Sequence, residues 1–213
     1  MDAAMKRVLR QQAEAVIEKL ERNNMKGYYA ASKAEAVEKV AELLHEGDTV
    51  AVGGSMSLEE AGVMALLRSG RYQFLDRYAP GLTREEIEEI YRRSFFADAY
   101  LCSSNAVTMN GELYNVDGNS NRVAAICYGP RSVIMVVGCN KIVKDLAAAD
   151  ARVKAVAAPA NAKRLSCKTP CAVTGQCENC QSPGRICCTY VLHRYQRVPG
   201  RIKVILVGQE LGY

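Results

Sequence analysis

The sequence predicts an α/β protein with a mostly parallel sheet flanked by helices. Segments with helical periodicity alternate with short β-branched runs before the cysteine-rich part of the chain, and this order is typical of parallel sheets. The 213 residues are 49% hydrophobic and 24% charged, a composition that excludes disorder and coiled coil. We expect residues 1–213 to form one domain, in which a cysteine-rich metal-binding segment at residues 163–190 is embedded.

The expected helices begin at recognisable caps. Residues 2–24 have helical composition without Gly or Pro. Residues 32–35 and 83–86 match the capping box, in which a Ser or Thr is followed three residues later by Glu. Residues 57–60 resemble a third cap, and residues 123–126 are helix-like.

The expected strands are short runs rich in β-branched and other apolar residues. They lie at residues 49–52, 71–75, 99–102, 133–137, 189–193 and 202–207. Between the third and fourth of these, Asn110-Gly111 is a strong hairpin signal.

A glycine loop follows the first expected strand. Gly53, Gly54 and Ser55 connect residues 49–52 to a helix, and free backbone N–H groups at such a junction favour an anion. Ligands of open parallel sheets bind at the carboxyl ends of the strands. A tight turn that needs glycine only for its geometry is the alternative. The spacing matches neither a Walker loop nor a dinucleotide fingerprint.

Two further polar loops follow expected strands and complete a predicted ligand site. Asn119, Asn121 and Arg122 precede the helix-like residues 123–126. An arginine in a first helical turn opposes the helix dipole, so Arg122 either holds an anionic ligand or forms an ion pair with Asp117. Lys141 follows the strand at 133–137 and either binds a carboxylate or phosphate or is a solvated lysine.

Six of the nine cysteines lie between Cys167 and Cys188, and clustered thiols in a reducing compartment indicate a metal site. We predict four ligands for a [4Fe–4S] cluster or zinc: Cys171, Cys177, Cys180 and Cys187. Iron–sulfur is favoured because a zinc ribbon has two Cys-x-x-Cys pairs and only one is present. Cys167 and Cys188 are alternative ligands or buried thiols.

The basic charge surrounds these cysteines. Residues 163–203 hold eight basic residues and one acidic residue, so this segment is +7 and the rest of the +5 chain is −2. Nucleic-acid binding and compensation of metal-bound thiolates both explain such a segment. We favour compensation, because only Tyr190 and Tyr195 could stack on bases there.

The sequence also limits where the protein acts. Its apolar runs are much shorter than the roughly 20 residues of a membrane-spanning helix. Residues 1–7 are charged and precede no apolar stretch of a secretory signal. We therefore expect a cytoplasmic protein without a membrane segment.

Five motifs together resemble the LUD-domain (lactate utilisation, formerly DUF162) family. They are Val-Gly-Gly-Ser-Met-Ser-Leu-Glu-Glu, Asn-Ala-Val-Thr-Met-Asn-Gly-Glu-Leu, Asp-Gly-Asn-Ser-Asn-Arg-Val-Ala-Ala, Val-Val-Gly-Cys-Asn-Lys-Ile-Val and Thr-Pro-Cys…Cys-Glu-Asn-Cys…Arg-Ile-Cys. The resemblance implies a NagB/RpiA/CoA-transferase-like fold. It also implies a role in lactate or organic-acid utilisation, in which some members accompany iron–sulfur redox proteins.

The resulting hypothesis is a protein that binds a small anion, a carboxylate or phosphate, at the sheet edge and holds an iron–sulfur cluster for electron transfer or structure. The alternative is a non-catalytic module that binds a ligand or a partner protein and holds a structural zinc. No residue is an obvious hydride or proton acceptor, so the sequence leaves open whether the protein is an enzyme. Substrate, partner proteins and homo-oligomer formation are also left open.

Overall fold

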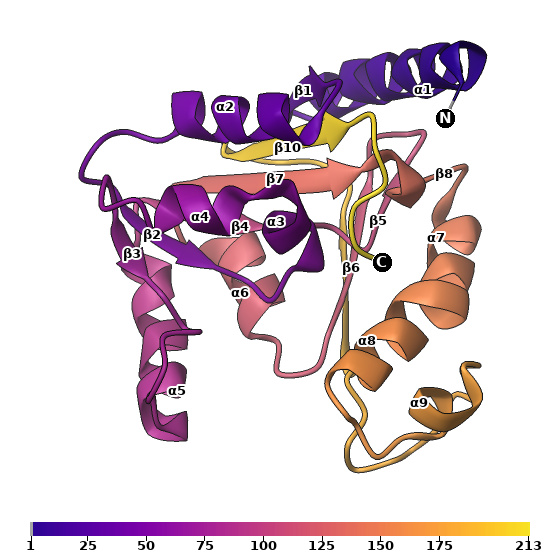
Figure 1. Cartoon of the computed structure of the whole chain (residues 1–213). Helices are drawn as coiled ribbons and strands as arrows, with labels where there is room; N and C mark the ends of the chain where they lie inside the picture. Colours follow the sequence, from indigo (N-terminus) through magenta and orange to yellow (C-terminus); the bar gives the residue numbers. More distant parts are fainter. Residues whose placement is uncertain (1) are drawn as a thin grey trace.

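The computed structural model describes residues 2–213, whose strands form two sheets (Figure 1). The six-stranded sheet has the order β1-β10-β7-β4-β2-β3, and every pair in it is parallel. Its strands are β1 (Lys26–Ala30), β2 (Thr49–Val52), β3 (Gln73–Leu75), β4 (Ala99–Cys102), β7 (Ser132–Gly138) and β10 (Ile202–Val207). The expected α/β class with a mostly parallel sheet is confirmed.

Nine α-helices are present in the part of the chain that the structure describes. They are α1 (Ala3–Arg22), α2 (Lys33–Leu43), α3 (Met56–Ala61), α4 (Val63–Leu67), α5 (Arg84–Arg93), α6 (Asn121–Tyr128), α7 (Leu146–Arg152), α8 (Ala158–Arg164) and α9 (Pro170–Thr174). A π-helical turn, Val153–Ala157, joins α7 to α8, and 3₁₀ turns lie at Ser94–Phe96 and Cys139–Lys141. No helix of residues 2–213 is long and apolar enough to cross a membrane.

Helices cover both faces of the parallel sheet because alternate residues of its strands point to opposite sides. In β7, Ile134 and Val136 pack in the cluster with α2, α3 and α4. Val133, Met135 and Val137 pack in the other cluster, with α1 and α6. Both sets are fully buried, so β7 lies at the centre of the core (Figure 1).

The second sheet has the order β8-β5-β6-β9 and packs beside α1 and α7. Its strands are β5 (Ala106–Thr108), β6 (Leu113–Asp117), β8 (Ile142–Val143) and β9 (Thr189–His193). The expected hairpin is present: Gly111 N–H donates to the Thr108 carbonyl at 2.9 Å, and Gly111 has a φ of +72°. A Cβ at this glycine would lie 2.7 Å from backbone atoms of α1, so the turn requires glycine.

Some elements differ from the sequence predictions. The helix expected to be capped at Ser57 is capped by Ser55, whose Oγ accepts from the Leu58 N–H at 3.3 Å. Ser57 is consequently inside α3 and fully buried. Strand β1 and helices α7–α9 were not expected. β1 begins with Lys26 and Gly27, whereas the N-cap Asp145 of α7 and Thr169-Pro170 at the start of α9 are start signals that the sequence predictions did not use. The Thr83 capping box is confirmed, with both of its reciprocal hydrogen bonds.

Candidate functional site

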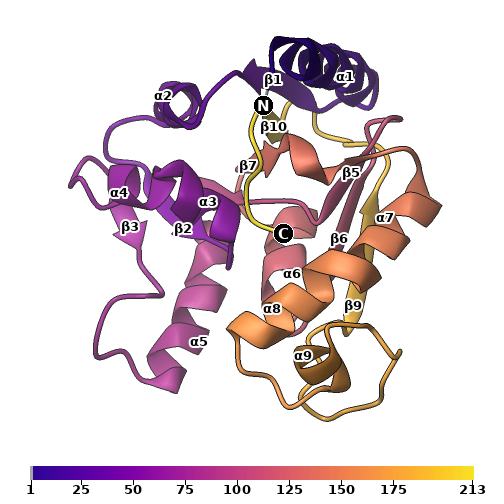
Figure 2. The same cartoon turned by 45° about the vertical axis from the view of Figure 1, so that its right-hand side comes forward.

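A pocket of about 230 Å³ lies at the carboxyl ends of adjacent strands β2, β4 and β7. Its lining includes Gly54, Ser103 and Lys141, which follow these strands in that order. Residues of α8 and the C-terminal Tyr213 line it from the opposite side. In Figure 2, the end of the chain, marked C, lies between α3 and α8. This is the sheet edge at which open parallel sheets bind ligands.

Six of the seven residues predicted to bind a ligand line this pocket. They are Gly54, Ser55, Asn119, Asn121, Arg122 and Lys141. Gly53 lies directly behind them: a Cβ at this position would be 3.0 Å from Arg122 Cδ and 3.1 Å from the Tyr100 hydroxyl. The structure therefore gathers the three polar loops at one edge. Ligand binding by these residues stays a prediction.

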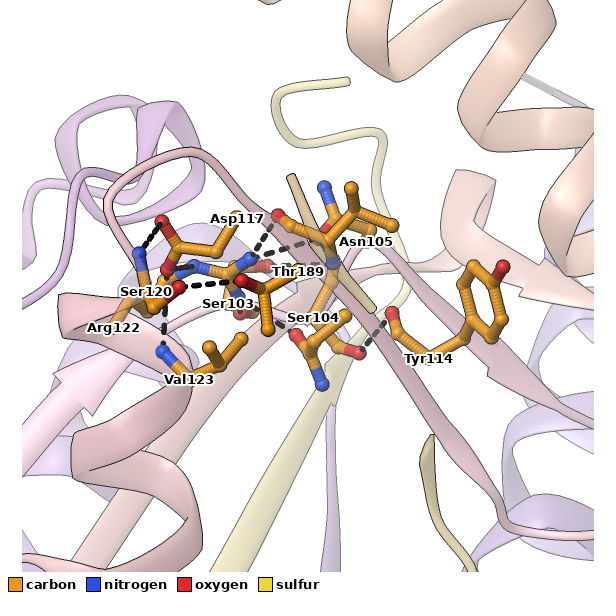
Figure 3. Close-up of polar contacts among 11 residues, drawn as sticks. Ser103, Ser104, Asn105, Tyr114, Asp117, Ser120, Arg122, Val123 and Thr189 are labelled. Atoms are coloured by element: carbon orange, nitrogen blue, oxygen red, sulfur yellow. Dashed lines mark hydrogen bonds and ion pairs between the residues drawn. The ribbon is translucent and has the colours of Figure 1, made fainter. Parts of the chain in front are cut away.

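The Arg122 guanidinium is bound by the protein itself (Figure 3). Nη1 donates to Asn115 Oδ1 at 2.7 Å and to the Ser103 carbonyl at 3.1 Å. Nη2 donates to the Val116 carbonyl at 2.7 Å and to Asn105 Oδ1 at 2.9 Å. All four Nη hydrogens thus hold the segments after β4 and in β6 together, and little of the guanidinium remains free for a ligand.

Asp117 forms an ion pair with Arg122 and also accepts hydrogen bonds from the start of α6. Its Oδ2 lies 3.7 Å from Arg122 Nε, which is the ion pair considered from the sequence. The same carboxylate accepts from the N–H groups of Ser120 and Val123, each at 3.2 Å. Ser120, the residue before α6, has a φ of 64° and caps nothing with its own side chain, so Asp117 caps α6 in its place.

Lys141 is almost completely buried, with 3% of its surface exposed. Its Nζ contacts Ser57 Oγ at 2.8 Å and Ser103 Oγ at 3.2 Å. Burial, together with the positive charges of Arg152 and Arg122, lowers the pKa of Lys141 to about 7. No carboxylate among residues 2–213 forms an ion pair with it. The lysine is therefore a buried amine rather than the solvated one considered from the sequence.

The pocket lining is strongly basic. It holds four basic side chains (Arg77, Arg122, Lys141 and Arg164) and one acidic side chain, Asp117. Arg77 stacks on the rings of Tyr91 and Tyr78, and its buried Nε has no partner among the described residues. Arg164 is exposed and bonds Asn161 Oδ1 through Nε and Nη2. Asp117, the one acidic side chain of the lining, already pairs with Arg122, so the remaining positive charge of the pocket favours an anion.

The cysteine-rich segment lies next to this pocket. Ile186 lines the pocket and contacts Gly118, and the Cys188 N–H donates to the Asp117 carbonyl at 3.0 Å. Arg185 organises the segment by donating to the carbonyls of Cys180 at 2.7 Å and Cys187 at 2.9 Å. Its second amino group also contacts Cys187 Sγ at 3.5 Å.

The four predicted metal ligands do not form a coordination site in this structure. Within residues 2–213, no three His, Cys, Asp or Glu side chains lie close enough together to hold a metal ion. All nine cysteines are free thiols. The metal site therefore stays a prediction.

Comparison with known proteins identifies the family. The family model described as LUD domain matches residues 13–207. The chain belongs to the LUD-domain family. Its structure is similar to the crystal structure of a DUF162 family protein from Deinococcus radiodurans, at 19% identity and a TM-score of 0.49, over 95% of this chain and 98% of that chain. No curated protein matches the chain.

Several residues of the LUD-domain pocket were missed in the sequence, among them Arg77, Ser103 and Arg164. Arg77 follows β3 and Ser103 directly follows β4, so the rule that ligands bind after parallel strands could have found both. Arg164 lies at the end of α8, and no local signal in the sequence places it near the sheet edge. Only the folding of α7 and α8 across that edge brings it to the pocket.

Proposed function

We propose that this LUD domain binds a small organic anion, of the carboxylate or phosphate class, in the pocket at the edge of the parallel sheet. The family is linked in general to lactate utilisation, which makes short hydroxy and oxo acids the first ligands to consider. The observation that carries the proposal is the charge of the lining, which has four basic side chains and one acidic side chain.

The basic residues have different roles in this proposal. Arg77 and Arg164 form no ion pair with a carboxylate among residues 2–213, so the protein does not neutralise their charges and each can attract an anion. Arg122 adds positive charge at the inner wall, and Lys141 adds it only in its protonated form, because its pKa is about 7. Gly54, Ser55, Asn119 and Asn121 line the same space, and we expect their backbone N–H groups and the asparagine amides to act as further donors.

The test is a calorimetric titration with L-lactate, pyruvate and inorganic phosphate. Lactamide, which has the shape of lactate without its charge, is the control ligand. We expect Arg77→Gln and Arg164→Gln each to weaken binding about tenfold or more, because each removes a charge-assisted hydrogen bond. Arg93→Gln, at an exposed position of α5, is the matched control. Equal binding of lactamide, or unchanged affinity in Arg77→Gln, Arg164→Gln and Arg122→Ala, would contradict the proposal.

We further propose that Cys171, Cys177, Cys180 and Cys187 hold a [4Fe–4S] cluster, with a structural zinc as the alternative. Support comes from Arg185, which already binds two of these residues, and from the contact of the segment with the pocket. A cluster would supply one-electron transfer beside the bound anion, or would only stabilise a segment of low apolar content. An iron–sulfur redox protein is the corresponding partner.

Metal analysis of anaerobically purified protein separates these outcomes. Iron and sulfide with a brown charge-transfer absorption would support the cluster. Zinc without colour would make the segment a structural element, and the pocket would then hold the function alone. Protein without any metal under these conditions would contradict both.

A further inference from the structure

Three polar side chains lie in contact at the inner wall of the pocket. The proposed anion binding gives no role to the two serines among them. Ser103 directly follows β4, Lys141 lies three residues after β7, and Ser57 is in α3 after β2. Because β2, β4 and β7 are neighbours in the sheet, the segments that follow them converge. Lys141 Nζ lies 3.2 Å from Ser103 Oγ and 2.8 Å from Ser57 Oγ.

The directions of these hydrogen bonds follow from the surroundings of Ser57. Its hydroxyl donates to the Leu211 carbonyl at 3.2 Å, and a hydroxyl has only one hydrogen to give. Ser57 must therefore accept from Lys141. The Ser103 hydroxyl has two acceptors within reach, the Ser104 carbonyl at 3.4 Å and the Lys141 amine at 3.2 Å. When Lys141 is neutral, its lone pair can accept from Ser103.

The groups around Lys141 favour the neutral amine. Burial has the largest effect on its pKa, and the positive charges of Arg152 and Arg122 lower the pKa further. Glu60 and the Cys102 thiol raise it, but less, so that the pKa is about 7. A buried lysine next to other cations is the environment in which lysine acts as a base at neutral pH.

We propose that Ser103 is the nucleophile of an acyl-transfer reaction, that Lys141 is its general base, and that Ser57 positions Lys141. A nucleophile within hydrogen-bond reach of a base that a third group orients is the arrangement of nucleophilic catalysis. Ser103 and Lys141 both line the pocket, whereas Ser57 does not. A substrate in the pocket can therefore reach Ser103 and Lys141, the two residues that would react.

The reaction balances with water as the only co-reactant. Ser103 Oγ gives its proton to Lys141 Nζ and bonds to the carbonyl carbon of an ester or amide. The bond to the leaving group then breaks, and the leaving group takes the proton from Lys141. Water, deprotonated by Lys141, attacks the acyl carbon, and Ser103 recovers its hydrogen as the carboxylic acid leaves.

The substrate class is a small ester or amide with a separate anionic group, which Arg77 and Arg164 would bind. This placement of the anionic group rests on the proposed function, whereas the Ser103–Lys141 contact does not. The pocket volume of about 230 Å³ favours an acyl part of a few carbon atoms.

The chain contains a matched control for a serine–lysine contact. Lys203 Nζ donates to Ser132 Oγ at 3.0 Å, at the start of β7. Burial lowers the pKa of Lys203 as well, but neither residue lines the pocket. If proximity to a lysine were sufficient for reactivity, Ser132 would react as Ser103 does.

The test is covalent labelling of the full chain by methanesulfonyl fluoride, a small neutral probe that does not require the anion site. Peptide mass spectrometry identifies the labelled serine, and the labelling rate is followed as a function of pH. We expect modification at Ser103, with a rate that rises with pH and levels off above the pKa of Lys141. Lys141→Met should lower the rate at least about 100-fold, and Ser132→Ala should leave it unchanged.

Ser57→Ala tests the positioning role. It removes the acceptor that stabilises the ammonium form of Lys141, so the midpoint of the pH profile should move to lower pH. A residue with only a structural role would change the rate or the stability without moving that midpoint. Circular dichroism shows whether each variant is folded, and the result for the unsubstituted protein does not depend on any variant.

Failure of this proposal is distinguishable from failure of the proposed function. No labelling of Ser103 at any pH at which the protein is folded, or equal labelling of Ser132, would overturn the serine–lysine assignment. If lactate or phosphate still bound in that case, the anion site would stand. Labelling at Ser103 without any anion binding would support the nucleophile and remove the anionic group from the substrate class.

Discussion

Asn115 Oδ1 accepts a 2.7 Å hydrogen bond from Arg122 Nη1, while Asn115 Nδ2 is buried and has no partner among the described residues. A buried amide that is satisfied on one side only depends strongly on its remaining contact. The Arg122–Asn115 pair therefore connects the pocket wall to the stability of the second sheet.

We expect Arg122→Met to lower the free energy of unfolding by about 3 to 5 kcal/mol. The substitution leaves Asp117 and Asn115 buried without their cationic partner, and breaking such a buried network has this effect. Urea denaturation monitored by circular dichroism measures it. Arg93→Met, on the exposed side of α5, should change the free energy by less than about 0.5 kcal/mol. Equal effects of the two substitutions would show that the network adds little stability.

Gly53 and Gly54 form a pair of adjacent positions with different space around them. A Cβ at Gly53 would meet Arg122 Cδ at 3.0 Å, whereas a Cβ at Gly54 would meet only the Tyr78 hydroxyl, at 3.4 Å. Arg122 is held by four hydrogen bonds and cannot move away easily. We expect Gly53→Ala to destabilise the protein by about 1 to 3 kcal/mol and Gly54→Ala to have a smaller effect. Thermal unfolding of both variants decides this, and a reversed order would contradict it.

Lys141 should make stability depend on pH above neutrality. Its pKa in the folded protein is about 7, below the value of about 10.4 for an unperturbed lysine. Between these values the unfolded chain binds the additional proton, so the stability of the protein rises with pH. We expect Lys141→Met to be more stable than the unsubstituted protein at and below pH 7, and this difference to shrink by about 1 kcal/mol per pH unit above it.

Urea denaturation at neutral and alkaline pH measures the difference. Lys6→Met, at an exposed position of α1, is the control and should behave like the unsubstituted protein at both. A difference between Lys141→Met and the unsubstituted protein that stays constant with pH would show that Lys141 is protonated in the folded state.

The cysteine proposal predicts a specific pattern of metal loss. Serine substitution at any one of Cys171, Cys177, Cys180 and Cys187 should reduce bound metal to a small fraction of that in the unsubstituted protein, because a tetrahedral site needs four thiolates. Cys127→Ser should retain the metal, since Cys127 is an exposed residue of α6 outside the segment. Metal retention by Cys177→Ser or Cys180→Ser would remove these residues from the ligand set.

The sequence predicted the sheet and most of the pocket because both depend on local signals. Apolar runs located β2, β4, β7 and β10, and the polar residues after three strands gave Gly54, Arg122 and Lys141. The parallel-sheet rule then placed these three residues at one edge, where the structure has them.

The parts of the site that the sequence did not predict depend on contacts between segments far apart in the chain. The partners of Arg122 lie in β6 and in the loop after β4, and nothing near residue 122 indicates them. Ser57 was interpreted as a helix cap, because its buried contact with Lys141, 84 residues away, has no local signal. The position of each cysteine relative to the others was equally inaccessible, since the segment has little secondary structure of its own.

The order of strands has a consequence for synthesis on the ribosome. β1, near the start of the chain, pairs only with β10 among the described strands, and β10 lies between β1 and β7 in the sheet. Until β10 has emerged, β1 has no neighbour and β7 keeps an open edge. The apolar face of α1 is then also without its full cover. Completion of this sheet must therefore wait until residues 202–207 have emerged, and the nascent protein exposes unpaired strand edges during that interval.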